Sequence, residues 1–352
     1  ACGKAIALDS ANPDGHHNLA LALYPIGRLE EATQAMRRAV ALRPDSSHGW
    51  GALLLILNYR PDVTPHMLWQ EHRLWGERHG RTREELGLLP SPVPLAGRRL
   101  RVGYVSGDFR EHSVAYFLEP ILAHHDRDHV EVFCYSEFAH AKQDAVTARL
   151  QAFAEHWIDT QGLDDLALAR RMREDGIDIL VDLAGHTAGN RLLALAYRPA
   201  PVQVSYLGYV NTTGLPAMDY RLTDEWADPP GQEAFHTERL VRLPHGFLCY
   251  RPPDDAPEVA LLPAQTAGYV TFGSFNMLPK TTPQVIALWA RLLQTLPNAR
   301  LVLKNKSLRD PGTAERCAAL FAAQGIDSRR LELIGWLPSR QEHLGLYSRI
   351  DI

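Results

Sequence analysis

The chain has 352 residues, of which 45% are hydrophobic and 22% are charged, with a formal net charge of −4. At about 150 residues per domain this length predicts two or three domains, and the composition is that of a globular protein rather than a disordered or fibrous one. A negative net charge argues against a nucleic-acid-binding protein, which needs a basic face.

The sequence offers no segment for a membrane and no pattern for a metal. The longest apolar run, residues 51–57, is far shorter than the about 18 to 20 residues that cross a bilayer. No basic and apolar leader opens the chain, so we expect a cytoplasmic protein. The cysteines lack the short pair spacings of zinc or redox sites. We therefore expect structural thiols at Cys2, Cys134, Cys249 and Cys317.

The beginning of the chain carries a helical repeat. Ala5 recurs as Ala39, 34 positions later, and a helix–turn–helix period of 34 residues is typical of tetratricopeptide repeats. One whole repeat fits residues 13–46, preceded by the tail of another and followed by the start of a third. Because such repeats bind extended peptides, this one predicts a protein that acts on other proteins. A plain helical hairpin is the alternative.

A further helix is expected after the repeat. Leu68, His72 and Trp75 share one face of a helix over residues 64–80, which offers support to the partial repeat. The proline-rich sequence at 90–94 is stiff and extended, because each proline fixes its own φ and restricts the residue before it. We therefore expect a domain boundary at these prolines.

The hydrophobic pattern then changes to that of an α/β protein. Four apolar runs have the length of strands: Leu100–Ser106, Val130–Ser136, Ile177–Leu183 and Val202–Leu207. Helical stretches lie between the first three of them, over Val114–His124 and Asp164–Glu174. This alternation predicts a parallel sheet covered by helices on both faces.

The alternation restarts after a second proline-rich segment, residues 252–257. Strands are expected over Tyr269–Phe275, Arg300–Lys304 and Leu331–Ile334, and helices over Pro283–Leu296 and Pro311–Gln324. The chain is therefore expected to contain two Rossmann-like lobes with a cleft between them. Since three strands are few for such a lobe, and residues 349–352 read as the start of another strand, we expect the second lobe to be incomplete in this chain.

Polar turns follow three strands of the first lobe. Ligands of open α/β sheets collect at the carboxyl ends of strands. His112 follows the first strand, His186 lies in the sequence GHTAGN after the third, and Gly208 lies in a glycine-rich turn after the fourth. Each turn alone can be ordinary turn chemistry, and a single histidine is more often a helix cap or a surface group. Three such turns together predict a binding site.

A cationic turn follows the first strand of the second lobe. The sequence TFGSFNMLPK contains Asn276 and ends in Lys280 before a helix, where a lysine can reach a diphosphate. Arg340 and His343 open the last helix near the same strand ends, unless they form a solvated first turn. No phosphate-binding-loop or dinucleotide fingerprint is present, which argues against a nucleoside triphosphatase or a dinucleotide dehydrogenase.

Together these blocks resemble the O-linked N-acetylglucosamine transferase family and its plant relatives of the SPINDLY type. The sequences that carry the resemblance include RVGYVSGDFREHSVAYFLEP, DILVDLAGHTAGNR, RPAPVQVSYLGYVNTTG and TFGSFNMLPK. The resemblance implies a GT-B fold behind the repeats and an inverting transfer of a sugar from a nucleotide diphosphate to Ser or Thr hydroxyls of proteins. It implies no metal or other cofactor, because cationic side chains and helix amino termini meet the charge of the leaving group.

The resemblance also implies roles for single residues. His112 matches a histidine beside the donor sugar that has been considered as the base, and Lys280 matches the lysine that binds the diphosphate. His343 matches a histidine at the nucleotide base, with Arg340 at a nearby lysine-bearing position. The remaining expected donor contacts are Gly208, Asn276 and His186.

Two features qualify these implications. The family's later Gly/His-Thr-Thr turn, which faces the diphosphate, would lie beyond Ile352, so we expect an incomplete donor site in this chain. The stretches GHTAGN, NTTGLP and DEWADPP favour the SPINDLY branch, which would imply GDP-fucose. UDP-N-acetylglucosamine is the commoner assignment for bacterial-looking members and is the donor we expect, with a protein or peptide acceptor guided by the repeats.

Three other functions stay open at this point. They are a protein O-fucosyltransferase that uses GDP-fucose, a non-catalytic scaffold that holds peptides, and a transferase of small acceptors. The expected domains are partial tetratricopeptide repeats (1–58), a helical linker (59–97), an amino-terminal catalytic lobe (98–256) and a truncated carboxyl-terminal catalytic lobe (257–352).

Overall fold

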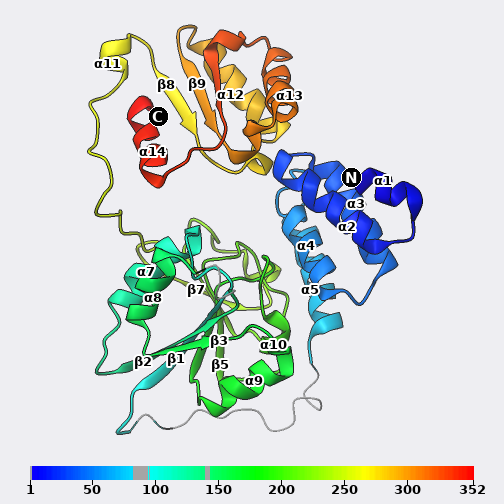
Figure 1. Cartoon of the computed structure of the whole chain (residues 1–352), viewed down its shortest axis with the longest axis vertical. Helices are drawn as coiled ribbons and strands as arrows, with labels where there is room; N and C mark the ends of the chain where they lie inside the picture. The colour runs from blue at the N-terminus through cyan, green and yellow to red at the C-terminus, as the bar shows by residue number, and fades with distance from the viewer. Residues whose placement is uncertain (1, 82–93, 95, 139–142) are drawn as a thin grey trace. The chain divides into compact units, whose positions relative to one another are not determined.

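The computed structural model describes residues 2–81, 94, 96–138 and 143–352 (Figure 1). Residues 90–93 of the proline-rich stretch expected to mark a boundary lie outside the described residues. The chain forms two compact units. The first unit comprises Ala1–Pro44, Tyr59–Pro61 and Pro252–Ile352, and the second comprises Asp45–Asn58 and Asp62–Arg251.

A seven-stranded parallel sheet forms the centre of the second unit, with the strand order β3-β2-β1-β4-β5-β6-β7. Its strands are β1 (Leu100–Ser106), β2 (Val130–Ser136), β3 (His156–Asp159), β4 (Ile179–Asp182), β5 (Val202–Ser205), β6 (Tyr220–Thr223) and β7 (Arg239–Arg242). The four predicted strands are confirmed as β1, β2, β4 and β5. The prediction missed β3, β6 and β7, which are only four residues long.

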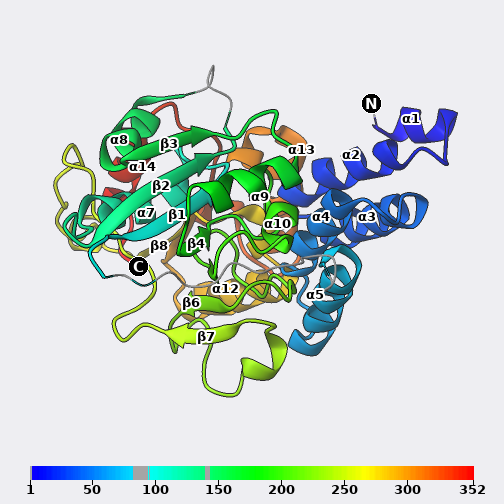
Figure 2. The ribbon, with the colours of Figure 1, turned by 90° about the horizontal axis from the view of Figure 1, so that it is seen from below.

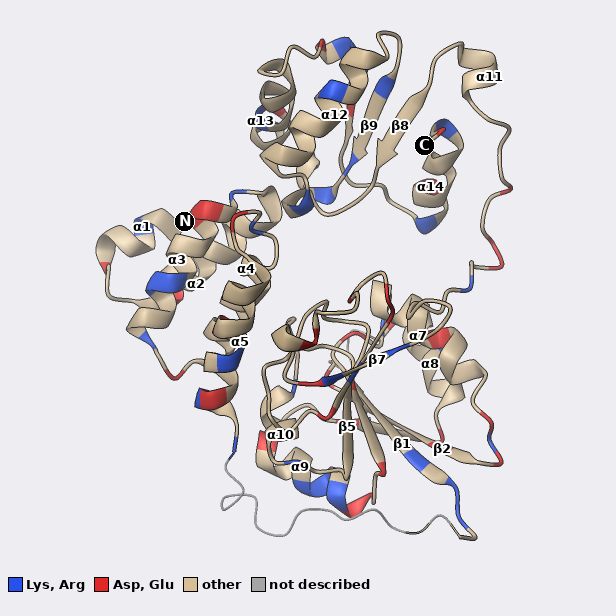
Figure 3. Cartoon of the chain, turned by 180° about the vertical axis from the view of Figure 1, so that it is seen from behind, with Lys and Arg blue, Asp and Glu red and all other residues tan. Residues whose placement is uncertain are grey.

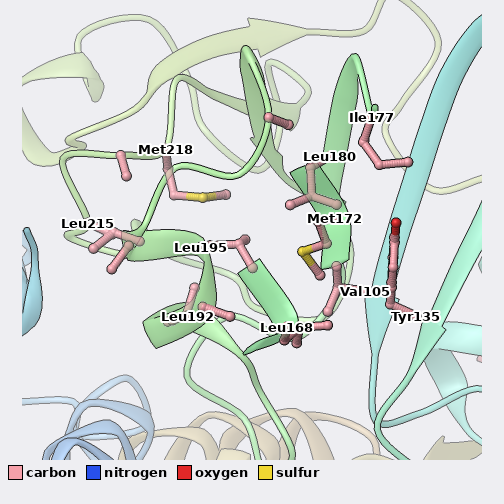
Figure 4. Packing of buried hydrophobic residues seen from close by; sticks show 14 of the residues in the cluster. Val105, Tyr135, Leu168, Met172, Ile177, Leu180, Leu192, Leu195, Leu215 and Met218 are labelled. Carbon is pink, nitrogen blue, oxygen red and sulfur yellow. The ribbon is translucent and has the colours of Figure 1, made fainter. Parts of the chain in front are cut away.

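Helices cover both faces of this sheet, as predicted (Figures 1 and 2). They are α7 (Ser113–Ala123) and α8 (Ala145–Phe153) on one face, and α9 (Asp165–Glu174) and α10 (Leu192–Ala196) on the other. Alternate residues of β1 point to opposite faces, so Tyr104 packs with the α7 cluster and Val105 with the α9 cluster. In Figure 4, Val105 and Leu180 pack near Met172 of α9.

Two helices that precede the sheet in sequence belong to the same unit, α4 (Ser47–Leu57) and α5 (Pro65–His79). The predicted helix over 64–80 is confirmed as α5, which begins where the side chain of Thr64 accepts a hydrogen bond from the backbone N–H of Met67. Leu54 and Trp75 are buried in the same hydrophobic cluster as α9 and α10. Both helices are therefore part of the core of the second unit.

A three-stranded parallel sheet with the order β10-β9-β8 lies in the first unit. Its strands are β8 (Thr271–Ser274), β9 (Arg300–Lys304) and β10 (Leu331–Ile334), and its helices are α11 (Ala264–Ala267), α12 (Pro283–Thr295), α13 (Pro311–Ala322) and α14 (Arg340–Gly345). These strands, and α12 and α13, confirm the predicted elements. The backbone N–H of Asp351 donates to the carbonyl of Thr271 at 2.9 Å, so the chain continues beside β8.

Three amino-terminal helices complete the first unit: α1 (Cys2–Leu8), α2 (Pro13–Leu23) and α3 (Leu29–Leu42). A short 3₁₀ turn links α2 to α3 and ends at Gly27, whose φ of 77° is in the left-handed region that favours glycine. The carbonyls of this turn bind the carboxyl-terminal part of the unit, because Pro25 accepts from the Ser307 hydroxyl at 2.8 Å and Ile26 from Arg316 at 2.9 Å. The assignment of these helices to tetratricopeptide repeats stays a prediction. Within the described residues, no helix combines the length and hydrophobicity needed to cross a bilayer.

Candidate active site

The turns that follow β1, β4 and β5 touch one another at the carboxyl edge of the seven-stranded sheet. A Cβ atom on Gly107 would lie 3.2 Å from the carbonyl oxygen of Gly189, and a Cβ atom on Gly208 would lie 1.9 Å from that of Leu183. Glycine is needed at position 208 because any larger residue would overlap the end of β4. The three turns that the sequence singled out therefore meet at one edge, where ligands of open parallel sheets bind.

His112 lies at the amino terminus of α7, directly after the turn that follows β1. Its Nδ1 accepts a hydrogen bond from the backbone N–H of Val114 at 3.3 Å, and the side chain is 38% exposed. Burial lowers the pKa of His112, an effect that Asp108 opposes and Arg110 reinforces. Since the ordinary pKa is about 6.5, the imidazole is neutral at pH 7. With Nδ1 as acceptor, the proton of the neutral ring is on Nε2.

A buried carboxylate stands behind this imidazole. Oδ2 of Asp108 is 3.5 Å from Nδ1 of His112, while its Oδ1 accepts from Arg110 at 3.1 Å. The backbone N–H of Asp108 donates to the hydroxyl of Ser106 at 2.9 Å, which fixes the turn to the end of β1. If the ring proton moves to Nδ1, Asp108 stabilises it there, and Nε2 becomes a proton acceptor.

Buried polar groups hold the turn after β5. Glu238 accepts from the hydroxyl of Thr212 at 2.5 Å and from the backbone N–H of Thr213 at 2.7 Å, and also from the hydroxyl of Thr213. Arg221 donates to the carbonyl of Tyr209 at 2.8 Å. Glu238 and Arg221 were not predicted to belong to the site, because they lie outside the turn in sequence: Glu238 is 26 positions from Thr212 and 25 from Thr213.

Tyr209, next to Gly208, is fixed by the two helices that precede the sheet. Its hydroxyl is 2.7 Å from Nε2 of His72 and 2.7 Å from the side-chain nitrogen of Asn58. Nδ1 of His72 is 2.6 Å from the carbonyl of Leu68 and must donate to it, so Nε2 accepts the proton of the tyrosine. Burial lowers the pKa of His72 to about 4, which keeps this hydrogen bond in place at neutral pH.

His186 is buried beneath the turns rather than open to solvent, with 3% of its surface exposed. Its Nε2 donates to the carbonyl of Thr213 at 2.7 Å, and the Trp75 ring packs edge-on at 4.6 Å. Burial, followed by the nearby His72, lowers the pKa of His186 to about 3. The ring thus supports the packing of the turns, and its contact with a donor stays a prediction.

The first unit gathers the other predicted donor contacts at the carboxyl ends of β8 and β9. The ring of His343 in α14 lies 5.8 Å from Phe275, which follows β8 directly. Burial, together with the charge of Lys304, lowers the pKa of His343. The carbonyl of Asn276 accepts from the side chain of Asn305 at 3.0 Å, which ties the two strand ends together.

The two cations predicted for this edge come from different elements. Arg340 is the first residue of α14, one turn before His343. Lys280 ends a 3₁₀ turn shortly before α12 and is exposed. Within the described part of the chain, its ammonium group has no hydrogen bond or ion pair. An exposed ammonium group without a counter-ion is suited to bind an anion.

Comparisons with known proteins agree on one family. The sequence model of glycosyl transferase family 41 matches residues 89–251. A protein of Oryza sativa subsp. japonica named as a probable UDP-N-acetylglucosamine–peptide N-acetylglucosaminyltransferase, SPINDLY, is 42% identical over 323 residues, which cover 91% of this chain and 34% of that protein. An Arabidopsis thaliana protein with the same enzyme name, SEC, is 35% identical over 247 residues, which cover 67% of this chain and 25% of that protein.

A solved structure extends the similarity to the fold. A mutant of the O-GlcNAc transferase of Thermobaculum terrenum is 40% identical, and its structure superposes with a TM-score of 0.93 over 100% of this chain and 66% of the other. The chain spans about a third of the length of the plant relatives, since it covers 34% of the rice protein.

Proposed function

Because this chain belongs to glycosyl transferase family 41, we propose that it is part of a protein O-glycosyltransferase that moves N-acetylglucosamine from UDP-N-acetylglucosamine to Ser or Thr hydroxyls. The names of the rice and Thermobaculum relatives support the donor and the peptide acceptor. The observation that carries the proposal is the neutral imidazole of His112 beside the interlocked turns of the sheet edge.

In the proposed reaction, the acceptor oxygen attacks the anomeric carbon and the bond to the diphosphate oxygen breaks. The acceptor proton must leave, and negative charge collects on the diphosphate. His112 takes the proton on Nε2 when its own ring proton sits on Nδ1, facing Asp108. Lys280 meets the charge of the diphosphate, and the backbone at Gly208 lines the sugar.

The nucleotide base is proposed to lie against the rings at the end of β8. His343, Phe275 and Tyr347 form a contiguous aromatic group, with centroid distances of 4.6 to 5.8 Å. Such rings offer a stacking surface for a planar base. Asn276 and Arg340 flank this group and supply polar contacts.

Calorimetry on the full-length protein tests the donor and the role of Lys280 together. UDP-N-acetylglucosamine should bind, and Lys280→Ala should weaken that binding by about 1.5 to 3 kcal/mol, the usual contribution of a charge-assisted hydrogen bond. Lys4→Ala, which removes an exposed ammonium group from α1, should leave binding unchanged. Failure to bind any nucleotide sugar, or equal binding by the two variants, would contradict the proposal.

A SPINDLY-like O-fucosyltransferase is the second candidate. It is favoured by the higher identity to the SPINDLY protein, 42% against 35% for the SEC protein. Titration of GDP-fucose in the same experiment separates the two donors. If a peptide binds but neither sugar is transferred, and binding survives both His112→Ala and Lys280→Ala, the protein is instead a peptide-binding scaffold.

A further inference from the structure

A polar cavity of about 180 Å³ lies in the second unit, close to the turn that follows β4. Residues that line it include Ser47, Trp75, Asp165, His186 and Asn190. They come from the start of α4, from α5, from the start of α9 and from the loop after β4. A liquid water occupies about 30 Å³, so the cavity is large enough for several waters or for the end of one long side chain.

One wall of this cavity carries a hydrogen-bond acceptor that is not used. Since Nε2 of His186 donates to Thr213, Nδ1 of the neutral ring keeps its lone pair. This atom is buried and has no hydrogen-bond partner among the described residues. Burial lowers the pKa of His186 to about 3, so the ring does not satisfy Nδ1 by taking up a proton at neutral pH. A group that donates a hydrogen is therefore missing from this position.

The second hydrogen-bond acceptor of the cavity is the carboxylate of Asp165, which lies in a negatively charged surrounding. Asp165, in the acidic first turn of α9 (Figure 3), is 3.1 Å from Arg191, and the same guanidinium is 2.8 Å from Glu137. Two carboxylates thus share one cation, which leaves a net charge of −1. The side chain of Asp165 is 34% exposed, so a ligand reaches it from solvent.

Two donors of the lining are already engaged. The indole N–H of Trp75 donates to the carbonyl of Ser47 at 3.3 Å, and the side-chain amide of Asn190 donates to the carbonyl of Thr187 at 2.8 Å. The cavity therefore offers two acceptors and negative charge, beside the ring of His48 and the hydroxyl of Ser47, which can accept as well as donate. Such a lining repels phosphate and carboxylate groups and suits a cation that carries several N–H groups.

We propose that this cavity binds the ammonium or guanidinium group of a Lys or Arg side chain in the acceptor polypeptide, through Nδ1 of His186 and the carboxylate of Asp165. The inference rests on the proposed function, because it takes the acceptor to be a polypeptide. It assigns the site a role in acceptor choice, separate from the donor contacts at His112 and Lys280, and this role replaces the donor contact expected of His186.

A peptide library tests this preference. The full-length protein is given peptides with one central Ser or Thr and with Lys, Arg, Glu or norleucine at each flanking position. We expect Lys and Arg to be favoured at one flanking distance, and Asp165→Asn to lower kcat/KM for those peptides about tenfold. Norleucine peptides, and hydrolysis of the donor by water, should be unaffected by the substitution. Glu174→Gln, at the other end of α9, is the matched control and should behave as wild type.

Absence of a basic preference in the wild-type enzyme, or an unchanged preference in Asp165→Asn, overturns the inference. If no peptide is glycosylated at all, the proposed function fails instead. Binding of the Lys and norleucine peptides, measured by fluorescence anisotropy, then still decides whether the cavity holds a cation. Equal binding of the two peptides overturns it.

A second variant tests the histidine half of the site without removing a charge. A Cβ atom on Gly51 would lie 3.5 Å from Nδ1 of His186, so a serine hydroxyl there can donate to this nitrogen. We expect Gly51→Ser to reduce the Lys and Arg preference at least threefold, whereas Gly51→Ala, whose methyl cannot donate, keeps it. A Gly51→Ser enzyme with the wild-type preference and an unchanged Tm overturns the contact with His186.

Discussion

The carboxyl edges of the two sheets differ in how exposed their side chains are and in how firmly hydrogen bonds hold their turns. At the seven-stranded edge, His186 and Glu238 are each only 3% exposed, and hydrogen bonds fix the turns before any ligand arrives. At the three-stranded edge, Asn276 and Lys280 are exposed. Dipoles that are already oriented need no reorganisation during reaction. The seven-stranded edge, which we call the rigid edge, is therefore suited to position the reacting groups. The three-stranded edge, which we call the open edge, is suited to receive the charge of a leaving group.

The largest effect should come from removing the imidazole of His112, the base that we propose at the seven-stranded edge. We expect His112→Ala to lower the transfer rate by about 10² to 10⁴, the usual contribution of a general base. His112 also caps α7 through Val114. His112→Asn is the control, because asparagine keeps a helix cap but takes up no proton. Transfer rates should fall in both variants, and full activity in the Asn variant would assign the histidine to capping alone.

The next effect tests whether the turn after β5 needs its buried carboxylate. The hydroxyl of Thr212 already accepts from the backbone N–H groups of Gly214 and Thr237, each at 3.1 Å, so it must donate to Glu238. In Glu238→Gln, the side-chain N–H₂ replaces one carboxylate oxygen. It then faces a hydroxyl or backbone N–H that also donates. We expect a loss of about 2 to 3 kcal/mol of unfolding free energy, measured by urea denaturation, and weaker donor binding.

Glu225→Gln provides the control for this loss of charge. Glu225 is exposed, and its substitution should change the unfolding free energy by less than about 0.5 kcal/mol. Equal stabilities of the two variants would show that the buried carboxylate does not hold the turn.

How far the sequence predicted this molecule depends on how local each signal is. Strands such as β1 and β2 were predicted because most of their seven residues are apolar, whereas β7 was missed because its four residues begin and end with arginine. The strand-end position of His112 is likewise a local property. The hydrogen bond between His72 and Tyr209 joins residues 137 positions apart, and no pattern of spacing reveals such a pair.

A pH titration of the unfolding free energy should show that the folded protein keeps His72 neutral. The pKa of His72 is about 4 in the folded protein and about 6.5 in the unfolded chain. Below pH 6.5 the unfolded chain therefore binds more protons, and stability falls as the pH falls toward 4. At pH 5 the loss from His72 is about 2 kcal/mol relative to pH 7, at about 1.36 kcal/mol per pH unit.

The measurement compares the pH dependence of unfolding in His72→Gln with that in the wild-type protein. In His72→Gln, the unfolding free energy should fall between pH 7 and pH 5 by about 2 kcal/mol less than in wild type. The pKa of His186 is lowered mainly by its burial and only secondly by His72, so its contribution should be nearly the same in both proteins. An identical pH dependence of His72→Gln and wild type would mean that His72 is not held neutral in the folded state.

The smallest expected effect concerns the open edge. If Lys280 and a helix amino terminus suffice to meet the charge on the diphosphate, a divalent cation has no role in the step. Incubation with excess EDTA should then change the transfer rate by less than about twofold, a difference of about 0.4 kcal/mol in activation free energy. The same treatment should leave the defect of Lys280→Ala unchanged, and added Mg²⁺ should not repair it. If EDTA instead abolishes transfer and Mg²⁺ restores it, a metal ion rather than Lys280 neutralises the charge on the diphosphate. The exposed lysine would then not explain how the three-stranded edge receives the leaving group.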